Sequence, residues 1–155
     1  MTESLRTAAV VVTYNRLPLL RQCLAALTAQ TAPGLTIFLI DNASTDGTAE
    51  AVAAMALPNL VYRNTGKNLG GAGGFAYGVR EAALAGYDAL WLMDDDTLPT
   101  PTALAEFLQA DRDLHGRYGW LSGRALAPDG TDQPMNLQRV TPYKDLPSFD
   151  GARIP

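Results

Sequence analysis

Short apolar runs alternate with longer amphipathic stretches along about the first 115 residues of the chain. The stretches repeat their apolar residues at helical spacing, as Leu20, Leu24 and Leu27 do between Leu17 and Gln30. Strands that alternate with helices predict an α/β fold with a mostly parallel sheet. The predicted strands are 8–13, 36–40, 60–63 and 89–93, and the predicted helices are 17–30, 44–55, 74–84 and one that begins at Pro101.

Capping residues place the ends of several of these elements. Ser44 is expected to be the N-cap of the second helix, Gly86 to end the third, and Thr100 to cap the fourth. The fourth strand is apolar at every position, which predicts a central parallel strand covered on both faces. Beyond residue 115 the pattern changes: 120–126 has the composition of a strand and 128–130 that of a turn, and 131–155 has no clear period.

The composition is that of one soluble domain. The 155 residues are 47% apolar and 18% charged, and no apolar run approaches the ~18 residues of a membrane span. The first residues lack the layout of a secretory signal, so a cytoplasmic protein is expected. A net charge of −4 provides no basic face for a phosphate backbone, which makes nucleic acid an unexpected partner. The single cysteine, Cys23, occupies an apolar helix position and is expected to be buried.

Polar residues follow each predicted strand. They are TYNR at 13–16, DN at 41–42, NTGKNLGG at 64–71 and DDD at 94–96. Parallel sheets place their binding crevice at the carboxyl ends of the strands, so these four segments are expected to meet at one edge of the sheet. The three aspartates need a partner, because two like charges ~4 Å apart repel by about 4 kcal/mol at an effective dielectric of 20.

A divalent cation would offset this repulsion. Alternation along an extended chain places Asp94 and Asp96 on one side and Asp95 on the other, so the outer pair can share a metal ion. Mg²⁺ and Mn²⁺ use one or two carboxylates and fill their other positions with water or substrate phosphates. The alternative is a solvated acidic loop, but the cluster follows a fully apolar strand, which favours a metal with a phosphorylated ligand.

Two further patterns have alternative interpretations. Gly71, Gly73 and Ala76 match the dinucleotide fingerprint GxGxxA, with Asp94 downstream as a candidate ribose contact. That fingerprint belongs directly after a first strand, whereas here it follows the third, so a dinucleotide-binding protein is the weaker hypothesis. Asp41 is either a contact for a nucleobase or ribose, or the start of an Asx-type turn.

Four motifs taken together resemble a known family. They are VVVTYNR at 10–16, IDNASTDGT at 40–48, NLGGAGGFAYG at 68–78 and WLMDDDTLP at 91–99. In order, spacing and strand-end placement they resemble family 2 glycosyltransferases, and within that family most closely the bacterial galactofuranosyl- and rhamnosyltransferases of cell-surface polysaccharide synthesis. The resemblance implies the GT-A fold, a Rossmann-like, mostly parallel sheet with helices on both faces, of which the C-terminal part is incomplete here.

The resemblance also implies an inverting transfer of a sugar from a UDP- or dTDP-linked donor to a glycan or lipid-linked acceptor. Thr13, Tyr14 and Arg16 would line the base pocket, Asp41 would contact the pyrimidine, and Asn68 would lie over the nucleotide. Asp94 and Asp96 would bind Mn²⁺ or Mg²⁺ on the diphosphate, with Asp94 also near the ribose and Asp95 toward the sugar or acceptor. The implied nucleotide-sugar-binding set is Thr13, Tyr14, Asn15, Arg16, Asp41, Asn68, Asp94 and Asp95.

The chain departs from the family in its last part. Residues 1–115 correspond to the nucleotide-sugar-binding half of one domain and 116–155 to the start of the acceptor half, but neither an ED-type motif nor QxxRW is present. The general base therefore has no assigned residue; the remaining acids are Asp129, Asp132, Asp145 and Asp150. The expected protein is a fragment of a transferase or a short form that binds a nucleotide sugar without efficient transfer. A peripheral contact with the inner face of the membrane follows from the resemblance alone, and an NAD-binding oxidoreductase is the third hypothesis.

Overall fold

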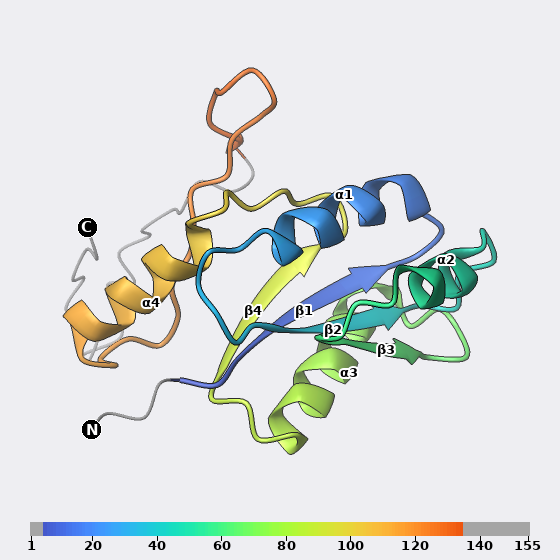
Figure 1. The fold of residues 1–155 in the computed structure, drawn as a ribbon, viewed down its shortest axis with the longest axis horizontal. Helices are drawn as coiled ribbons and strands as arrows, with labels where there is room; N and C mark the ends of the chain where they lie inside the picture. Colours follow the sequence, from blue (N-terminus) through green and yellow to red (C-terminus); the bar gives the residue numbers. More distant parts are fainter. Residues whose placement is uncertain (1–4, 135–155) are drawn as a thin grey trace, which may run out of the picture. The chain divides into compact units, whose positions relative to one another are not determined.

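The structure is a computed structural model that describes residues 5–134 of the chain. Strands and helices alternate along it, as predicted (Figure 1). The strands are β1 (Thr7–Thr13), β2 (Thr36–Asp41), β3 (Leu60–Asn64) and β4 (Ala89–Asp94), and the helices are α1 (Leu17–Thr28), α2 (Thr48–Met55), α3 (Gly70–Leu84) and α4 (Ala103–Leu114). Each strand lies within a residue of its predicted bounds, and the predicted α/β fold is confirmed.

The four strands form one parallel sheet in the order β3-β2-β1-β4. Along the chain, β2 and β3 are added on one side of β1, and β4 is added on the other side. The strand order therefore reverses at β1, and in open α/β sheets ligands bind at the carboxyl ends of the strands at such a reversal. The register pairs Val12 with Asp94 and Thr13 with Asp41, so the polar segments that follow β1, β2 and β4 begin at the same level of the sheet.

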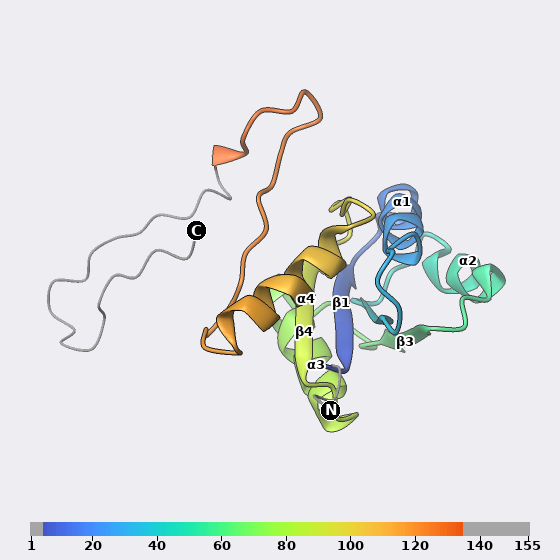
Figure 2. The ribbon, with the colours of Figure 1, turned by 60° about the vertical axis from the view of Figure 1, so that its left-hand side comes forward.

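Helices cover both faces of the sheet (Figures 1 and 2). On one face, α1, α2 and α4 bury a cluster that contains Leu20, Leu24, Val52 and Leu104. Cys23 belongs to this cluster with no exposed surface, as predicted, and burial raises the pKa of its thiol to about 12. On the other face, α3 packs on β1 and β2 through a second cluster built around Val10, Val12, Phe38, Ile40 and Ala82.

Two glycines let α3 lie unusually close to the sheet. A Cβ at Gly74 would stand 2.6 Å from a methyl group of Val12, and one at Gly78 would stand 2.4 Å from a methyl group of Val10 and 2.8 Å from Ile40. All three distances are far below an ordinary contact, so no larger residue fits without a shift. The glycines of this motif therefore serve helix-to-sheet packing, a role that their four-residue spacing allowed and the sequence analysis missed.

The predicted helix starts needed three corrections. Ser44 is not an N-cap, because its backbone N–H donates to Asp41 at 2.7 Å and its hydroxyl accepts from Asn15, and the helix begins only after Gly47. The third helix starts at Gly70 rather than Gly74; it ends at Leu84, as predicted, but its C-cap is Ala85 rather than Gly86. The fourth is capped by Thr102 rather than Thr100, since the Thr102 carbonyl accepts the first helical N–H, that of Glu106.

The predicted central position of the fourth strand is also wrong within the described residues. β4 pairs there only with β1 and forms an edge of the sheet. The side chains of Trp91 and Met93 face the cluster beneath α1 and α4, whereas Leu92, on the opposite side, is 48% exposed. An apolar strand sequence shows that a strand is well packed on one face, but not how many neighbours it has.

The chain divides into two compact units, residues 1–117 and 118–155. In the described part of the second unit, the expected strand at 120–126 does not form, and Leu126 makes a single antiparallel bridge with Asp132. The predicted turn is present, since Gly130 N–H donates to the Ala127 carbonyl at 2.9 Å. None of the helices in residues 5–134 has the length and apolar character needed to span a bilayer.

Candidate functional site

The residues with the strongest predicted chemistry lie where β1 and β4 end side by side. Thr13 is the last residue of β1 and is 1% exposed, and Asp94 is the last residue of β4. Because β1 and β4 are neighbours, the TYNR turn and the three aspartates, 80 residues apart in sequence, meet at one place. This is also the place where the strand order reverses, so topology and chemistry indicate the same site.

Asp95 points into the protein and is only 3% exposed. Its carboxylate accepts a 2.7 Å hydrogen bond from the Thr13 hydroxyl and lies 3.5 Å from the guanidinium of Arg16. Burial raises the pKa of Asp95, and the Thr13 hydroxyl and the Arg16 charge partly offset that rise. Asp95 thus joins the ends of β1 and β4 in this structure, and its predicted contact with sugar or acceptor remains a prediction.

Asp94 and Asp96, which precede and follow the buried Asp95 in the sequence, are both exposed. The Asp96 carboxylate accepts from Arg16 at 3.1 Å, and the Asp94 carboxylate has no hydrogen bond or ion pair with any side chain of residues 5–134. No group of three or more histidine, cysteine or acidic side chains in that range is arranged to hold a metal ion. Two exposed carboxylates are nevertheless the donor set that Mg²⁺ or Mn²⁺ uses when phosphates and water complete its shell, so the residues fit the predicted ion.

The turn after β1 is tied to the loop after β2. Asn15 N–H donates to the Ser44 hydroxyl at 2.9 Å, and the Asn15 side-chain oxygen accepts from Thr45 N–H at 2.7 Å. Two residues on, Leu17 N–H donates to the Asp46 carboxylate at 3.0 Å. These contacts hold Asn15 at a φ of 52°, a left-handed conformation that asparagine tolerates better than most residues. Asn15 therefore supports the turn, while Tyr14 beside it is 45% exposed.

This connection between the two loops was not predicted from the sequence. About 30 residues separate the partners, and no spacing rule links an asparagine after one strand with a serine and a threonine after the next. The available signal was indirect: small polar residues occur at the ends of two strands that were expected to be neighbours.

Asp41 is completely buried at the end of β2. One carboxylate oxygen accepts from Ser44 N–H at 2.7 Å, and the other accepts from the Tyr62 hydroxyl at 2.6 Å. Burial and the hydrogen bond to Asp41 raise the pKa of Tyr62 to about 12. Asp41 therefore closes a local turn, but its bond reaches three residues on rather than the two of the expected Asx-type turn. Contact with a pyrimidine stays a prediction.

Asn68 is exposed in the segment between β3 and α3. Its side-chain oxygen accepts from Gly70 N–H at 2.8 Å, which orders the start of α3. Asn42, which follows Asp41, reaches the same place by donating from its side chain to the Gly70 carbonyl at 3.1 Å. The contact of Asn68 with a nucleotide stays a prediction; its side-chain amide nitrogen has no hydrogen bond recorded within residues 5–134.

The acids considered as a general base are engaged locally where they are described. The Asp129 carboxylate accepts from the backbone and hydroxyl of Thr131, and Asp132 pairs with Arg124 at 2.6 Å. Both pKa values are lowered by these partners. Asp145 and Asp150 lie outside the described residues. No residue of 5–134 is therefore assigned as the base.

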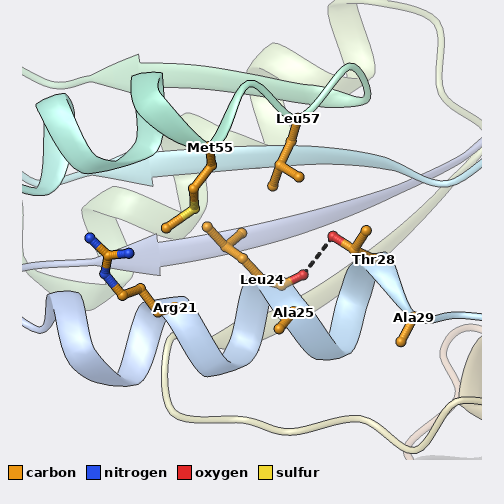
Figure 3. Close-up of a pocket in the computed structure, with 7 residues that line it drawn as sticks. All are labelled: Arg21, Leu24, Ala25, Thr28, Ala29, Met55 and Leu57. Atoms are coloured by element: carbon orange, nitrogen blue, oxygen red, sulfur yellow. Dashed lines mark hydrogen bonds between the residues drawn. The ribbon is translucent and has the colours of Figure 1, made fainter.

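A separate apolar pocket of about 480 Å³ lies between α1 and the end of α2. Figure 3 shows Leu24 and Met55 facing one another across it, with Arg21 at one end. The lining residues are Arg21, Leu24, Ala25, Thr28, Ala29, Met55 and Leu57. None of the predicted site residues lines this pocket, so it is distinct from the cluster at the strand ends.

Comparison with known proteins identifies relatives along most of the chain. Galactofuranosyltransferase GlfT1 of Mycolicibacterium smegmatis is 36% identical over 115 residues, which are 74% of this chain and 38% of that protein. N-acetylglucosaminyl-diphospho-decaprenol L-rhamnosyltransferase of Mycobacterium tuberculosis is 44% identical over 61 residues, which are 39% of this chain and 20% of that protein. The chain thus spans about two fifths or less of the length of these curated relatives.

Solved structures show the same fold. S. aureus TarS 1-349 in complex with UDP-GlcNAc has a TM-score of 0.63 at 22% identity, over 71% of this chain and 32% of that chain. Mannosyltransferase PcManGT from Pyrobaculum calidifontis, in complex with GDP-Man and Mn²⁺, has a TM-score of 0.61 at 25% identity, over 83% of this chain and 37% of that chain. The predicted GT-A fold is confirmed by these likenesses.

A single match to one protein family covers all the segments that form the site. The sequence model described as "Glycosyl transferase family 2" matches residues 8–121, which begin in β1 and extend beyond α4. That range includes the TYNR turn, the loop after β2, the glycine-rich start of α3 and the three aspartates. The chain belongs to glycosyl transferase family 2.

Proposed function

We propose that this chain is the donor-binding part of an inverting glycosyltransferase that uses a UDP- or dTDP-linked sugar and a divalent metal ion. The observation that carries the proposal is the meeting of the TYNR turn and the three aspartates at the reversal of strand order. Family membership supports a nucleotide-sugar donor, and PcManGT, a neighbour of the same fold, holds GDP-Man and Mn²⁺.

Different residues of the chain are proposed to bind the metal ion, the diphosphate and the base. Asp94 and Asp96 present exposed oxygens that would hold Mn²⁺ or Mg²⁺, and the bound ion would stabilise the negative charge of the diphosphate leaving group. Arg16, which the resemblance assigned to the base pocket, lies beside both Asp95 and Asp96, and there it is suited to a phosphate oxygen instead. Tyr14, exposed next to them, offers a ring on which a base can stack.

Asp41 and Asn68 complete the proposed nucleotide site from β2 and from the start of α3. For Asp41 to accept a hydrogen bond from a pyrimidine, either Tyr62 or the Ser44 N–H must share its oxygen, since both oxygens are already occupied. A carboxylate oxygen has two lone-pair sites, so sharing is chemically permitted. Complete burial of Asp41 makes it the site residue that requires the largest local adjustment.

The proposal gives the acceptor only as a chemical class and assigns no residue as the catalytic base. A glycan or lipid-linked acceptor is proposed, which the N-acetylglucosaminyl-diphospho-decaprenol in the name of the rhamnosyltransferase relative supports. A peripheral contact with the inner face of the membrane is proposed from the family resemblance alone. An inverting transfer needs a general base within hydrogen-bond reach of the acceptor hydroxyl. If such a base is absent from the whole protein, the second candidate function is a nucleotide-sugar-binding module without transferase activity.

Thermal unfolding with added nucleotides tests the donor and the metal together. The chain is heated with UDP, dTDP, GDP or NAD, each with and without Mn²⁺. A ligand at 100 times its Kd stabilises by about 2.7 kcal/mol, which raises the Tm of a chain of this size by about 5–10 °C. The rise is expected with UDP or dTDP plus Mn²⁺. A rise with NAD in the absence of metal, and none with UDP or dTDP plus Mn²⁺, would contradict the proposal.

Two variants make this experiment specific. Asp96→Asn removes one proposed metal ligand and is expected to abolish the Mn²⁺-dependent part of the rise. Asp113→Asn is the matched control, because Asp113 lies on α4 and is bonded to Gln109 rather than to the site. Sugar transfer or donor hydrolysis by the chain, compared with Asp96→Asn, then separates a transferase from a binding module, since a module gives equal rates in both.

A further inference from the structure

Arg16 holds two of the three aspartates at once. The same guanidinium nitrogen, Nη1, lies 3.1 Å from Asp96 and 3.5 Å from Asp95. Within residues 5–134, these are the only ion pairs that the structure records for Asp94, Asp95 and Asp96. The positive charge that the sequence analysis assigned to a metal ion is thus already supplied in part by a side chain of the protein.

The backbone of Arg16 is fixed on both sides. Asn15 N–H is bound by Ser44 and Leu17 N–H by Asp46, while the Arg16 carbonyl accepts from the N–H groups of Leu19 and Leu20, both at 3.0 Å. The side chain, by contrast, is 54% exposed. Arg16 can therefore leave the aspartates by rotation of its side chain alone, without any change in the turn or in α1.

Its two partners differ in how easily they can be released. The Asp95 side chain is 4% exposed and has a second partner, the Thr13 hydroxyl at 2.7 Å. Asp96 is 50% exposed, and Arg16 is its partner. Asp96 is also one of the two carboxylates that fit a divalent ion, so a metal ion at Asp96 and a guanidinium at 3.1 Å would be like charges competing for the same oxygens.

We propose that Arg16 is a resident counter-cation of the aspartate cluster, which opposes metal binding at Asp96 in the empty site and transfers to the diphosphate when nucleotide and metal bind together. The inference rests on the proposed function, because it needs a metal and a nucleoside diphosphate at this site. The guanidinium forms strong bidentate contacts with phosphate oxygens, so the released side chain gains a new anion as it loses Asp96. Metal ion and nucleotide are then coupled: each binds better in the presence of the other.

Direct measurement of Mn²⁺ binding tests the inference without any enzyme assay. The electron paramagnetic resonance signal of free Mn²⁺ is titrated with the 155-residue chain, with and without UDP. Arg16→Gln is expected to bind Mn²⁺ about tenfold more tightly than the wild type in the absence of UDP, the size of a partly screened repulsion between neighbouring charges. The gain in Mn²⁺ affinity on adding UDP is expected to be about tenfold smaller in Arg16→Gln than in the wild type.

Three further variants control the result. Arg16→Met removes the same charge with a different side chain and repeats the measurement should Arg16→Gln fold poorly, as judged by circular dichroism. Arg16→Lys keeps the charge and is expected to bind Mn²⁺ as the wild type does. Arg21→Gln removes one exposed positive charge from α1 away from the aspartates and is expected to change Mn²⁺ affinity by less than about twofold.

The outcomes separate this inference from the proposed function. If the wild type binds Mn²⁺ and UDP together but the neutral Arg16 variants bind Mn²⁺ no more tightly than Arg21→Gln, the counter-cation role is overturned and the proposed function stands. If neither the wild type nor any Arg16 variant binds Mn²⁺, with or without UDP, both are overturned. Weaker Mn²⁺ binding by Arg16→Gln in the absence of UDP would also overturn the inference, because it would show that Arg16 assists the metal.

Discussion

Replacing Gly78 by alanine tests the close approach of α3 to the sheet. Gly78 lies in the middle of α3, where alanine is favoured over glycine by about 1 kcal/mol on helix propensity alone. A sequence-based expectation would therefore be a more stable protein. The structure predicts the opposite, since the added Cβ would stand 2.4 Å from Val10 Cγ1 and 2.8 Å from Ile40 Cγ1.

The magnitude follows from how little room these neighbours have. The Cβ would be about 1 Å closer to Val10 than the 3.4 Å at which ordinary contacts begin. Val10 and Ile40 have no exposed surface and lie on the two central strands, so neither can move aside into solvent. Overpacking of this kind costs about 1–3 kcal/mol, and the gain in helix propensity offsets about 1 kcal/mol of that. A net loss of up to about 2 kcal/mol is expected, which lowers the Tm by up to about 8 °C.

Urea and thermal unfolding, followed by circular dichroism, measure this loss. The matched control is Gly71→Ala, also in α3, where an added Cβ meets nothing within 4 Å and φ is not left-handed. That variant is expected to be as stable as the wild type or more stable by up to about 1 kcal/mol. If Gly78→Ala is as stable as Gly71→Ala, the close packing of α3 on β1 and β2 is not what selects glycine at this position.

Three more substitutions test hydrogen bonds around the strand ends, each measured by urea unfolding. Thr13→Val leaves the buried Asp95 carboxylate without its 2.7 Å donor and is expected to cost about 1–3 kcal/mol, whereas a loss below about 0.5 kcal/mol would contradict that role. Tyr62→Phe removes a donor from the fully buried Asp41 and is expected to cost about 1–3 kcal/mol; an unchanged unfolding midpoint would show that the bond contributes nothing. The Asp46 carboxylate accepts hydrogen bonds from Thr48 and Leu17, and these lower its pKa below the ordinary 3.8. The ionised carboxylate therefore stabilises the fold above pH 3.8, and this stabilisation is lost as the pH falls through the lowered pKa of the folded protein. Asp46→Asn is thus expected to be less stable than the wild type by about 0.5–1 kcal/mol at neutral pH and equally stable in strong acid, and a difference independent of pH would refute this account.

The alternation of strands and helices could be predicted because periodicity records burial directly. The buried residues of α1, Leu20, Cys23, Leu24 and Leu27, are the ones that repeat at helical spacing, and β1 and β2 are buried along almost their whole length. The polar residues at the strand ends could be predicted for the same reason, since they interrupt the apolar runs. Parallel strands then bring them to one edge of the sheet, whatever the order of the strands.

The features that the sequence did not predict depend on contacts between distant segments. Ser44 has the composition of an N-cap, but Asp41 and Asn15 take its N–H and hydroxyl, and Gly47, at a φ of 84°, becomes the residue before the helix. The glycines between 70 and 74 have low helix propensity, which predicts a loop for this segment. The segment is nevertheless helical, and at position 74 the sheet leaves room only for a residue without a Cβ. In each case a tertiary contact outweighs a local preference of about 1 kcal/mol.

The strand order explains why the four polar segments have different roles although they lie at the same edge. Asp41, at the end of the central strand β2, has neighbours on both sides, and each of its carboxylate oxygens accepts a hydrogen bond, one from Tyr62 of β3 and one from Ser44. Asp94 and Asp96 follow β4, the edge strand of the described sheet, where only β1 lies alongside, and both remain exposed. Burial of a carboxylate in a network fixes geometry, whereas an exposed carboxylate remains free to exchange one cation for another. The β2 side of the site therefore supports the turn that carries Arg16, and the exchange of Arg16 for a metal ion is expected on the β4 side.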